Sequence, residues 1–309
     1  MDGGEKIKLV SIVGPTASGK SELAVRLAER FDGEIVNADS MQVYRGMDIG
    51  TAKPSPLLRQ RVPHHLVDIV SPDVNFSASD FRREAAAAIA DIQSRGRKAF
   101  VVGGTGLYIR ALLQGLVDSP SGDESIRREL VELAQRDGNE ELLRRLALVD
   151  PETAGHLHPN DRVRIVRALE VYLQTGRPIS TFRGEHGFAD IHYDCLKIGL
   201  RVERQELYRR IENRVEDMIE QGLIAEVEEL LRAGFTSDLK AMRSIGYKEI
   251  CAYLAGEYSL DAAVALIKRD TRRYAKRQMT WFNKDFEINW VEYPDSFVTI
   301  CNHVIEFFA

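Results

Sequence analysis

The sequence lacks any run of eighteen apolar residues, and it has only three cysteines among its 309 residues. A helix that spans a bilayer needs about twenty apolar residues, so we expect no spanning segment and no membrane partner. The opening residues MDGGEK lead directly into a short apolar run, which does not fit a cleavable secretion signal. The cysteines, Cys195, Cys251 and Cys301, show no C-x-x-C spacing, which disfavours a disulfide framework and a structural zinc site. We therefore expect a cytoplasmic globular protein whose cysteines are small buried side chains.

Strong net charge is also absent, because the formal charge is -5, which by itself argues weakly against a nucleic-acid partner. The average hides a local excess of positive charge between Leu266 and Lys284. Against the single acid Asp270, this stretch carries Lys268, Arg269, Arg272, Arg273, Lys276, Arg277 and Lys284, with Tyr274, Trp281 and Phe282 between them. A basic face with interleaved aromatic side chains suits a polyanion.

The order of apolar runs and helical patterns indicates an α/β fold. Between Ile7 and about Leu116, the runs LVSIV, EIVNADS, HHLVDIV and KAFVVGG each precede a helix-compatible stretch, which predicts a parallel sheet flanked by helices. From the turn VDSPSGD at 117–123 to about Thr181 the pattern is helical, which predicts an inserted all-helical subdomain. The strand pattern CLKIGLRV at 195–202 returns the chain to the sheet, and helical patterns follow at 204–234 and 260–282. We predict a core of residues 1–117 and 195–309, with 118–194 as the insert.

A glycine-rich turn after the first apolar run fits the phosphate-loop pattern G-x-x-x-x-G-K-S at every position, from Gly14 to Ser21. Gly14 and Gly19 allow backbone N–H groups to turn toward one anion, and the following helix adds its positive end. Lys20 supplies a full charge, and the Ser21 hydroxyl can bind magnesium. The same loop occurs in proteins that hydrolyse ATP, in kinases and in enzymes that release a diphosphate from carbon. The loop alone therefore does not identify the substrate.

Polar residues follow two other predicted strands, and ligands of such sheets bind beyond the carboxyl ends of the strands. Asp39 follows EIVNA, where it could act as a general base or magnesium partner, or only cap a turn. Thr105 lies in GGTGLY, whose glycines could shape a tight turn or let a substrate approach the backbone. Both turns should converge on the phosphate loop.

Two arginines in LYRRIENRV, Arg210 and Arg214, lie four residues apart and therefore on one helix face. They could pair with Glu206 or Glu212 on a solvated surface. Alternatively, one of them could clamp a diphosphate, because the planar guanidinium suits phosphate better than lysine does. We favour Arg214 as the clamp.

Seven blocks taken together resemble the tRNA dimethylallyltransferases, also called tRNA isopentenyltransferases. From Gly14 to Phe282 they read GPTASGKSELA, NADSMQVYRGMDIGTAKP, VPHHLVDI, VVGGTGLYIRALLQGL, HPNDRVRIVRALEVY, MRSIGYKEI and AKRQMTWF. The resemblance implies a P-loop NTPase-like fold. It also implies transfer of a dimethylallyl group from dimethylallyl diphosphate to N6 of the adenosine 3′ of the anticodon, at tRNA position 37. The partners would be the tRNA anticodon stem-loop and the prenyl donor, Mg²⁺ would be the cofactor, and a monomer is expected.

The resemblance also implies roles for individual residues. Asp39 would be the general base, and Thr105, Lys20 and Arg214 would complete the catalytic group, with Ser21 holding the metal. The donor diphosphate would bind Gly14, Pro15, Thr16, Ala17, Ser18, Gly19, Lys20 and Ser21. The tRNA would contact Asp39, Ser40, Met41, Gln42, Thr105, Arg127, Val163, Arg164, Ile165, Val166, Arg167, Arg243, Ser244, Ile245, Gly246, Tyr247, Lys248 and the stretch Tyr274 to Trp281 with Lys276, Arg277 and Gln278.

Eukaryotic members of the family append a zinc finger, whereas no metal-ligand cluster occurs before Ala309, so the chain resembles the bacterial form. Three other interpretations stay open on residues alone. A small-molecule or nucleotide kinase would also need the loop and magnesium, but it does not require the basic C-terminal helices. A non-catalytic RNA-binding module would not need Asp39 or the Lys20–Ser21 pair. A prenyltransferase acting on free adenylate would not need the helical insert.

Overall fold

The computed structural model describes residues 6–116, 120, 122–185 and 193–309, and the chain divides into two compact units. Unit 1 comprises Met1–Leu113 and Ile191–Ala309, and unit 2 comprises Gln114–Asp190. The boundaries predicted from the sequence lie at 117/118 and 194/195. In the described residues, no helix is both long and apolar enough to cross a membrane.

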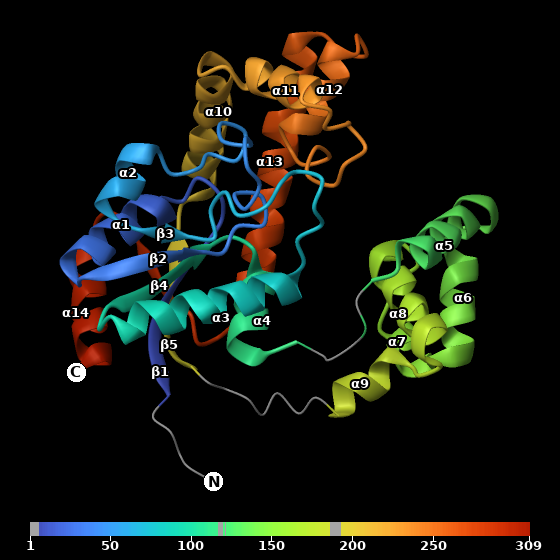
Figure 1. Ribbon diagram of the computed structural model, residues 1–309, viewed down its shortest axis with the longest axis horizontal. Helices are drawn as coiled ribbons and strands as arrows, with labels where there is room; N and C mark the ends of the chain where they lie inside the picture. The colour runs from blue at the N-terminus through green and yellow to red at the C-terminus, as the bar shows by residue number, and fades with distance from the viewer. Residues whose placement is uncertain (1–5, 117–119, 121, 186–192) are drawn as a thin grey trace. The chain divides into compact units, whose positions relative to one another are not determined.

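A six-stranded parallel sheet forms the centre of unit 1 (Figure 1). Its strands, in spatial order, are β3 (His64–His65), β2 (Gly33–Asn37), β4 (Lys98–Gly103), β1 (Ile7–Val13), β5 (Tyr193–Arg201) and β6 (Asn289–Glu292). Val13 pairs with Gly103 and Asn37 with Val102, so the ends of β1, β2 and β4 meet at one edge. The turns that follow these strands therefore lie together, because parallel strands share their carboxyl edge.

Alternating side chains of the strands build two apolar layers. On one face, Val10 and Ile12 pack with helices α1 (Lys20–Arg30) and α14 (Phe297–Phe308). On the other face, Leu9 and Val13 pack with α3 (Ala78–Ser94) and α4 (Gly106–Gln114). Strands buried on both faces are typical of parallel sheets, which explains why the apolar runs of the sequence are almost continuous.

The remaining helices of unit 1 extend from the same core. They are α2 (Pro56–Arg61), α10 (Arg204–Glu220), α11 (Leu223–Arg232), α12 (Tyr247–Leu254) and α13 (Leu260–Phe282). Figure 1 shows α10 and α13 rising beside the carboxyl edge of the sheet, with α11 and α12 at their far end. Val215 and Met218 of α10 and Ile267 of α13 belong to the same apolar cluster as the sheet residue Leu9.

Unit 2 is wholly helical in its described part. Its helices are α5 (Glu124–Asp137), α6 (Asn139–Val149), α7 (Pro151–Gly155), α8 (Arg162–Thr175) and α9 (Ile179–Glu185). Leu142, Leu146 and Ile165 are fully buried in its own apolar core. This core explains why the segment folds as helices without any strand of the sheet.

The structure differs from the sequence-based expectations in three elements. The strand expected over HHLVDIV is only His64–His65, because Leu66 and Asp68 take positive φ angles of 63° and 59°. The helical stretch 204–234 is two helices, since Gly222, which immediately precedes α11, has a φ of 102° in the left-handed region. Strand β6 was not anticipated, although it pairs in parallel with β5 along Ile198 to Arg201.

Candidate functional site

A cavity of about 610 Å³ in unit 1 brings the predicted segments together at the carboxyl edge of the sheet. It is lined by Thr16 to Glu22, the turn at Asp39 to Gln42, the turn at Gly103 and Gly104, the loop Gly50 to Ala52, the stretch Arg243 to Gly246 with Lys248, and side chains of α10 and α13. Gly14 and Pro15 begin the phosphate loop but do not line the cavity. The predicted convergence of the two polar turns on the loop is confirmed.

The phosphate loop has the backbone geometry that its glycines predict. Gly14 has a φ of 146°, and a Cβ there would lie 3.0 Å from the Leu200 carbonyl oxygen. Gly19, which immediately precedes α1, has a φ of 94° and provides no side-chain cap. The first N–H groups of α1 therefore face the cavity without a carboxylate or hydroxyl cap, which leaves them available to an anion.

One buried hydroxyl in the loop supports the same interpretation. The Ser18 side chain is 1% exposed, and among the described atoms its Oγ has no hydrogen-bond partner. A buried unpaired hydroxyl costs free energy, so such groups usually meet a ligand or water. Ser18 lines the cavity, and a bound phosphate oxygen would accept its hydrogen bond.

Two cations meet at the phosphate loop. Lys20 Nζ donates to the Pro15 carbonyl at 2.6 Å, and Arg214 of α10 lines the same cavity. Burial and the neighbouring Arg214 charge lower the pKa of Lys20 to about 7, although Asp39 opposes the shift. Burial also lowers the pKa of Arg214, again opposed by Asp39. Two neighbouring positive charges with only one carboxylate nearby repel each other, and a bound polyanion would relieve that repulsion.

The two candidate clamp arginines are now distinct. Arg210 Nε donates to Glu206 Oε1 at 2.7 Å, one turn earlier on α10, and it does not line the cavity. Arg214 lines the cavity and has no ion pair in the described part of the chain. The geometry therefore favours Arg214.

Asp39 lies opposite these cations and closes its own turn. Its Oδ1 accepts hydrogen bonds from the backbone N–H of Met41 at 2.8 Å and of Gln42 at 3.4 Å. The capping role considered from the sequence is thus present, but it occupies only one carboxylate oxygen. Oδ2 has no hydrogen bond within the described residues, so it can accept one from a substrate.

The turn GGTGLY is joined to the Asp39 turn by hydrogen bonds of Thr105. Thr105 Oγ1 accepts from the Ser40 N–H at 3.1 Å, and the Thr105 N–H donates to the Ala38 carbonyl at 3.3 Å. Burial and the Asp39 charge raise the pKa of Tyr274 to about 12, so its hydroxyl stays protonated at neutral pH. Thr105 does not line the cavity but orders the turn that does.

Gln278, which is predicted to contact tRNA, lines the cavity and has both ends of its amide engaged within the protein. Its Oε1 accepts from the Thr16 N–H at 2.8 Å, and its Nε2 donates to the Gly104 carbonyl at 3.0 Å. A Cβ on Gly104 would lie 2.1 Å from that nitrogen, so any larger residue would require the Gln278 amide to move and to give up these hydrogen bonds. Gln278 ties the phosphate loop to the turn after β4.

The stretch Arg243 to Lys248 forms another wall of the cavity, with one exception. Tyr247 is fully buried and does not line the cavity. Its hydroxyl donates to Glu226 Oε1 at 2.5 Å. The aromatic ring therefore packs as part of the protein core and does not offer a free surface for RNA.

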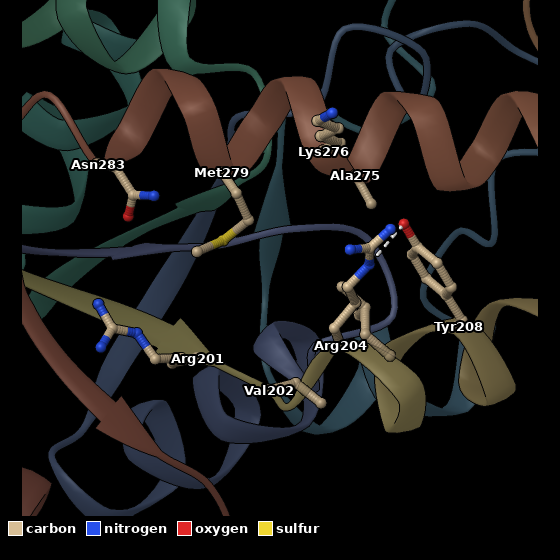
Figure 2. A pocket seen from close by; sticks show the side chains of 9 residues that line it. Arg201, Val202, Arg204, Tyr208, Ala275, Lys276, Met279 and Asn283 are labelled. Carbon is tan, nitrogen blue, oxygen red and sulfur yellow. Dashed lines mark hydrogen bonds between the residues drawn. The ribbon is translucent and has the colours of Figure 1, made fainter.

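A second cavity, of about 420 Å³, lies on another face of α13 (Figure 2). Its apolar wall includes Leu207, Ala275 and Met279, and its charged residues are Arg201, Arg204 and Lys276. None of these cations pairs with a carboxylate in the described chain; Arg204 Nε donates to the Tyr208 hydroxyl at 3.3 Å. The structure thus separates Lys276 from the first cavity, whereas Arg277 lines it.

The other predicted tRNA residues lie in unit 2. Arg127 and Arg167 both pair with the buried carboxylate of Glu170, at 2.9 Å and 2.6 Å. Val163 is 80% exposed, and the exposed Arg164 contacts Asp161 at 3.2 Å. The side chains of Ile165 and Val166 are in the core of the unit, so among Val163 to Arg167 they are the two that are withdrawn from the surface.

Several cavity residues were not identified from the sequence. Ile267 and Thr271 line the cavity with Tyr274 and Gln278, at intervals of three or four residues along α13. This helical spacing was the available signal. Nothing local indicated that Gly50, Thr51 and Ala52 would form a wall, because that depends on distant contacts.

Comparison with known proteins agrees with this geometry. The family model "IPP transferase" matches residues 42–285, and "Isopentenyl transferase" matches residues 7–62. The chain is 88% identical over 309 residues to tRNA dimethylallyltransferase 2 of Geotalea uraniireducens, with all of both chains covered. It is 65% identical to tRNA dimethylallyltransferase of Geobacter metallireducens, with 98% of both covered.

Solved structures show the same likeness. The tRNA isopentenylpyrophosphate transferase of Bacillus halodurans is 42% identical, with a TM-score of 0.73 over 98% of this chain and 97% of that one. A eukaryotic dimethylallyltransferase solved while acting on tRNA is 31% identical, with a TM-score of 0.78 over 92% of this chain and 73% of that one. The phosphate loop, the parallel sheet and these matches together show that the chain belongs to the tRNA dimethylallyltransferase family and has its P-loop NTPase-like fold.

Proposed function

We propose that this protein transfers a dimethylallyl group from dimethylallyl diphosphate to N6 of the adenosine at tRNA position 37. The products are N6-dimethylallyladenosine (i6A) and diphosphate. The observation that carries this proposal is one cavity that joins a phosphate loop, the cations Lys20 and Arg214, and the carboxylate of Asp39. Such a site suits a reaction in which a diphosphate leaves while an amine loses a proton.

The diphosphate side of the reaction rests on the phosphate loop. As the allylic C–O bond breaks, negative charge accumulates on the bridging oxygen of the donor. The N-terminal N–H groups of α1, Lys20 and Arg214 would stabilise that charge because they are already oriented and partly desolvated. Burial and Arg214 lower the pKa of Lys20, so the negative charge of a diphosphate would stabilise its ammonium form strongly.

Magnesium would bind beside the same phosphates. Mg²⁺ usually uses one or two protein oxygens, several waters and substrate phosphate oxygens. The Ser21 hydroxyl lines the cavity and supplies an oxygen ligand of that kind. The described residues hold no cluster of three or more His, Cys, Asp or Glu side chains that would form a separate metal site. When bound, Mg²⁺ would neutralise part of the diphosphate charge.

The amine side of the reaction rests on Asp39. The exocyclic N6 is a weak nucleophile because its lone pair is delocalised into the purine ring. A carboxylate within hydrogen-bond reach orients this amine and accepts its proton as the new C–N bond forms. Oδ1 is fixed by the Met41 N–H, so Oδ2 is the oxygen that would take the proton.

Contacts to the tRNA backbone would come from both units. In unit 1, the exposed side of α13 carries the basic residues Lys276 and Arg277. In unit 2, Arg164 is exposed, and Arg167 is partly exposed although it pairs with Glu170, so both guanidinium groups could contact phosphate. Neutralising Arg164 and Arg167 together should flatten the salt dependence of tRNA binding by about one unit of slope per lost contact. An unchanged slope would remove both residues from the interface.

With tRNA as substrate, we expect a cytoplasmic enzyme that acts as a monomer.

The activity is tested by incubating bulk tRNA with the protein, Mg²⁺ and dimethylallyl diphosphate, then analysing nucleosides by mass spectrometry. We expect i6A, and no product when the protein or donor is omitted. Free AMP in place of tRNA distinguishes a prenyltransferase of free adenylate. Efficient hydrolysis of ATP or GTP, with displacement of the prenyl donor at low micromolar concentration, would instead support the kinase interpretation.

A further inference from the structure

Glu226 of α11 makes an unusual set of contacts with a distant loop. Its Oε2 accepts hydrogen bonds from the backbone N–H groups of Asp48 at 2.9 Å and Ile49 at 2.7 Å. Its Oε1 accepts from the Gly50 N–H at 3.2 Å. Three successive amides thus converge on one carboxylate from a residue more than 170 positions away in the chain. Hydrogen bonds to a charged acceptor are stronger than neutral ones.

Tyr247 of α12 completes this arrangement. Its buried hydroxyl donates to Glu226 Oε1 at 2.5 Å, and a Cβ on Gly50 would lie 2.5 Å from its ring. Burial, followed by the negative charge of Glu226, raises the pKa of the Tyr247 hydroxyl, so it remains a donor. The same carboxylate therefore holds the loop at Gly50 and the first residue of α12, which follows the wall at Ser244 to Gly246.

The loop has other supports, so Glu226 is not needed merely to form it. Gln42 Nε2 donates to the carbonyls of Thr51 at 3.0 Å and Ala52 at 3.2 Å. The Lys53 side chain is 2% exposed, and its ammonium contacts Asp48 at 2.7 Å and Asp68 at 2.5 Å. These bonds hold the loop to the sheet side of the cavity, whereas Glu226 joins it to α11 and α12. Removing Glu226 should therefore change the distance between the loop at Gly50 and the segment Ser244 to Gly246 that precedes α12.

We infer that Glu226 is a positioning residue that sets the spacing between the two walls receiving the acceptor nucleotide, Gly50 to Ala52 and Ser244 to Gly246. The inference rests on the proposed function. Within the described residues, no hydrogen bond of the Glu226 or Tyr247 side chain reaches the phosphate loop, which Gln278 braces separately. The acceptor side should therefore depend on Glu226, and the donor side should not.

The test compares Glu226→Ala with Glu229→Gln, a control on an exposed residue of the same helix whose side chain makes no hydrogen bond or ion pair in the described structure. The readouts are KM for an anticodon stem-loop RNA, kcat per folded molecule, and the dissociation constant of dimethylallyl diphosphate measured without RNA. Loss of hydrogen bonds to a charged group predicts that Glu226→Ala raises KM for RNA by about tenfold or more. Donor affinity should stay within about twofold, and the control should match the wild type.

Two further variants keep the test decisive. Tyr247→Phe removes one hydrogen bond but keeps the carboxylate, so it should raise KM for RNA less than Glu226→Ala does. If Glu226→Ala fails to fold, Tyr247→Phe is the variant that tests the inference. Glu226→Gln keeps one acceptor oxygen and should fall between alanine and the wild type. A merely structural role would lower the folded fraction and leave KM unchanged.

An unchanged KM for RNA, or an equal loss of RNA and donor affinity, would overturn the inference. If the wild type itself makes no i6A, the proposed function fails; if the wild type is active and Glu226→Ala matches it, only the role of Glu226 fails.

Discussion

Lys20 should take up a proton when the prenyl donor binds. In the free protein its pKa is lowered to about 7, chiefly by burial and then by the positive charge of Arg214. A lowered pKa on a basic group means that the neutral amine dominates above pH 7. A bound diphosphate brings several negative charges beside the amine and thus restores its ordinary tendency to be charged.

The size of the effect follows from the pKa. At pH 8, a group with a pKa of about 7 is about nine-tenths neutral, so restoring its charge takes up about 0.9 proton per donor bound. The donor contributes little at this pH, because a phosphate with a second pKa of about 6 is already deprotonated. Calorimetric titrations of dimethylallyl diphosphate in two buffers of different ionisation enthalpy measure the uptake directly, at one fixed Mg²⁺ concentration.

Lys20→Arg is the matched control, because arginine keeps its charge across this pH range and should bind the donor with almost no uptake. An uptake below about 0.2 proton in the wild type would refute the reasoning from a lowered pKa. Equal uptake in the wild type and Lys20→Arg would show that another group is responsible.

Three other substitutions probe the same cavity. Asp39→Asn should lower kcat by about a hundred- to ten-thousand-fold while tRNA affinity changes little. Single-turnover kinetics and a melting curve measure kcat per folded molecule, and a near-normal value would show that Asp39 is not the base. Arg214→Lys should weaken donor binding by about tenfold, whereas Arg210→Lys, altered outside the cavity, should bind the donor like the wild type; equal effects in a donor titration would contradict this difference. Gly104→Ala should lower the free energy of unfolding by about 1–3 kcal/mol, because its Cβ would lie 2.1 Å from Gln278. An unchanged urea midpoint would mean that Gln278 moves aside at no cost.

Much of the fold was predictable because its signals are local. The β-branched runs around Ile12 and Val101 are strands, and the segment after Asp123 is helical. The errors arose where a single backbone angle or a distant partner decides the outcome. Positive φ angles at Leu66 and Asp68 end β3, and their residue types do not predict these angles. Strand β6 is short, and it is stabilised by pairing with β5, which the order of residues does not reveal.

The sequence by itself determined the phosphate loop, because Gly14, Gly19, Lys20 and Ser21 are neighbours in the chain and their turn depends on local backbone freedom. It also indicated Asp39 as a polar residue at the end of a strand. Only the tertiary structure decided which distant groups share the cavity. Arg214 meets Lys20 there because α10 packs against the carboxyl edge of the sheet, and Glu226 reaches Gly50 because α11 folds back over the loop. Electrostatic interactions and burial depend on distances in space, so residues far apart in sequence acquire these roles only when the chain is folded.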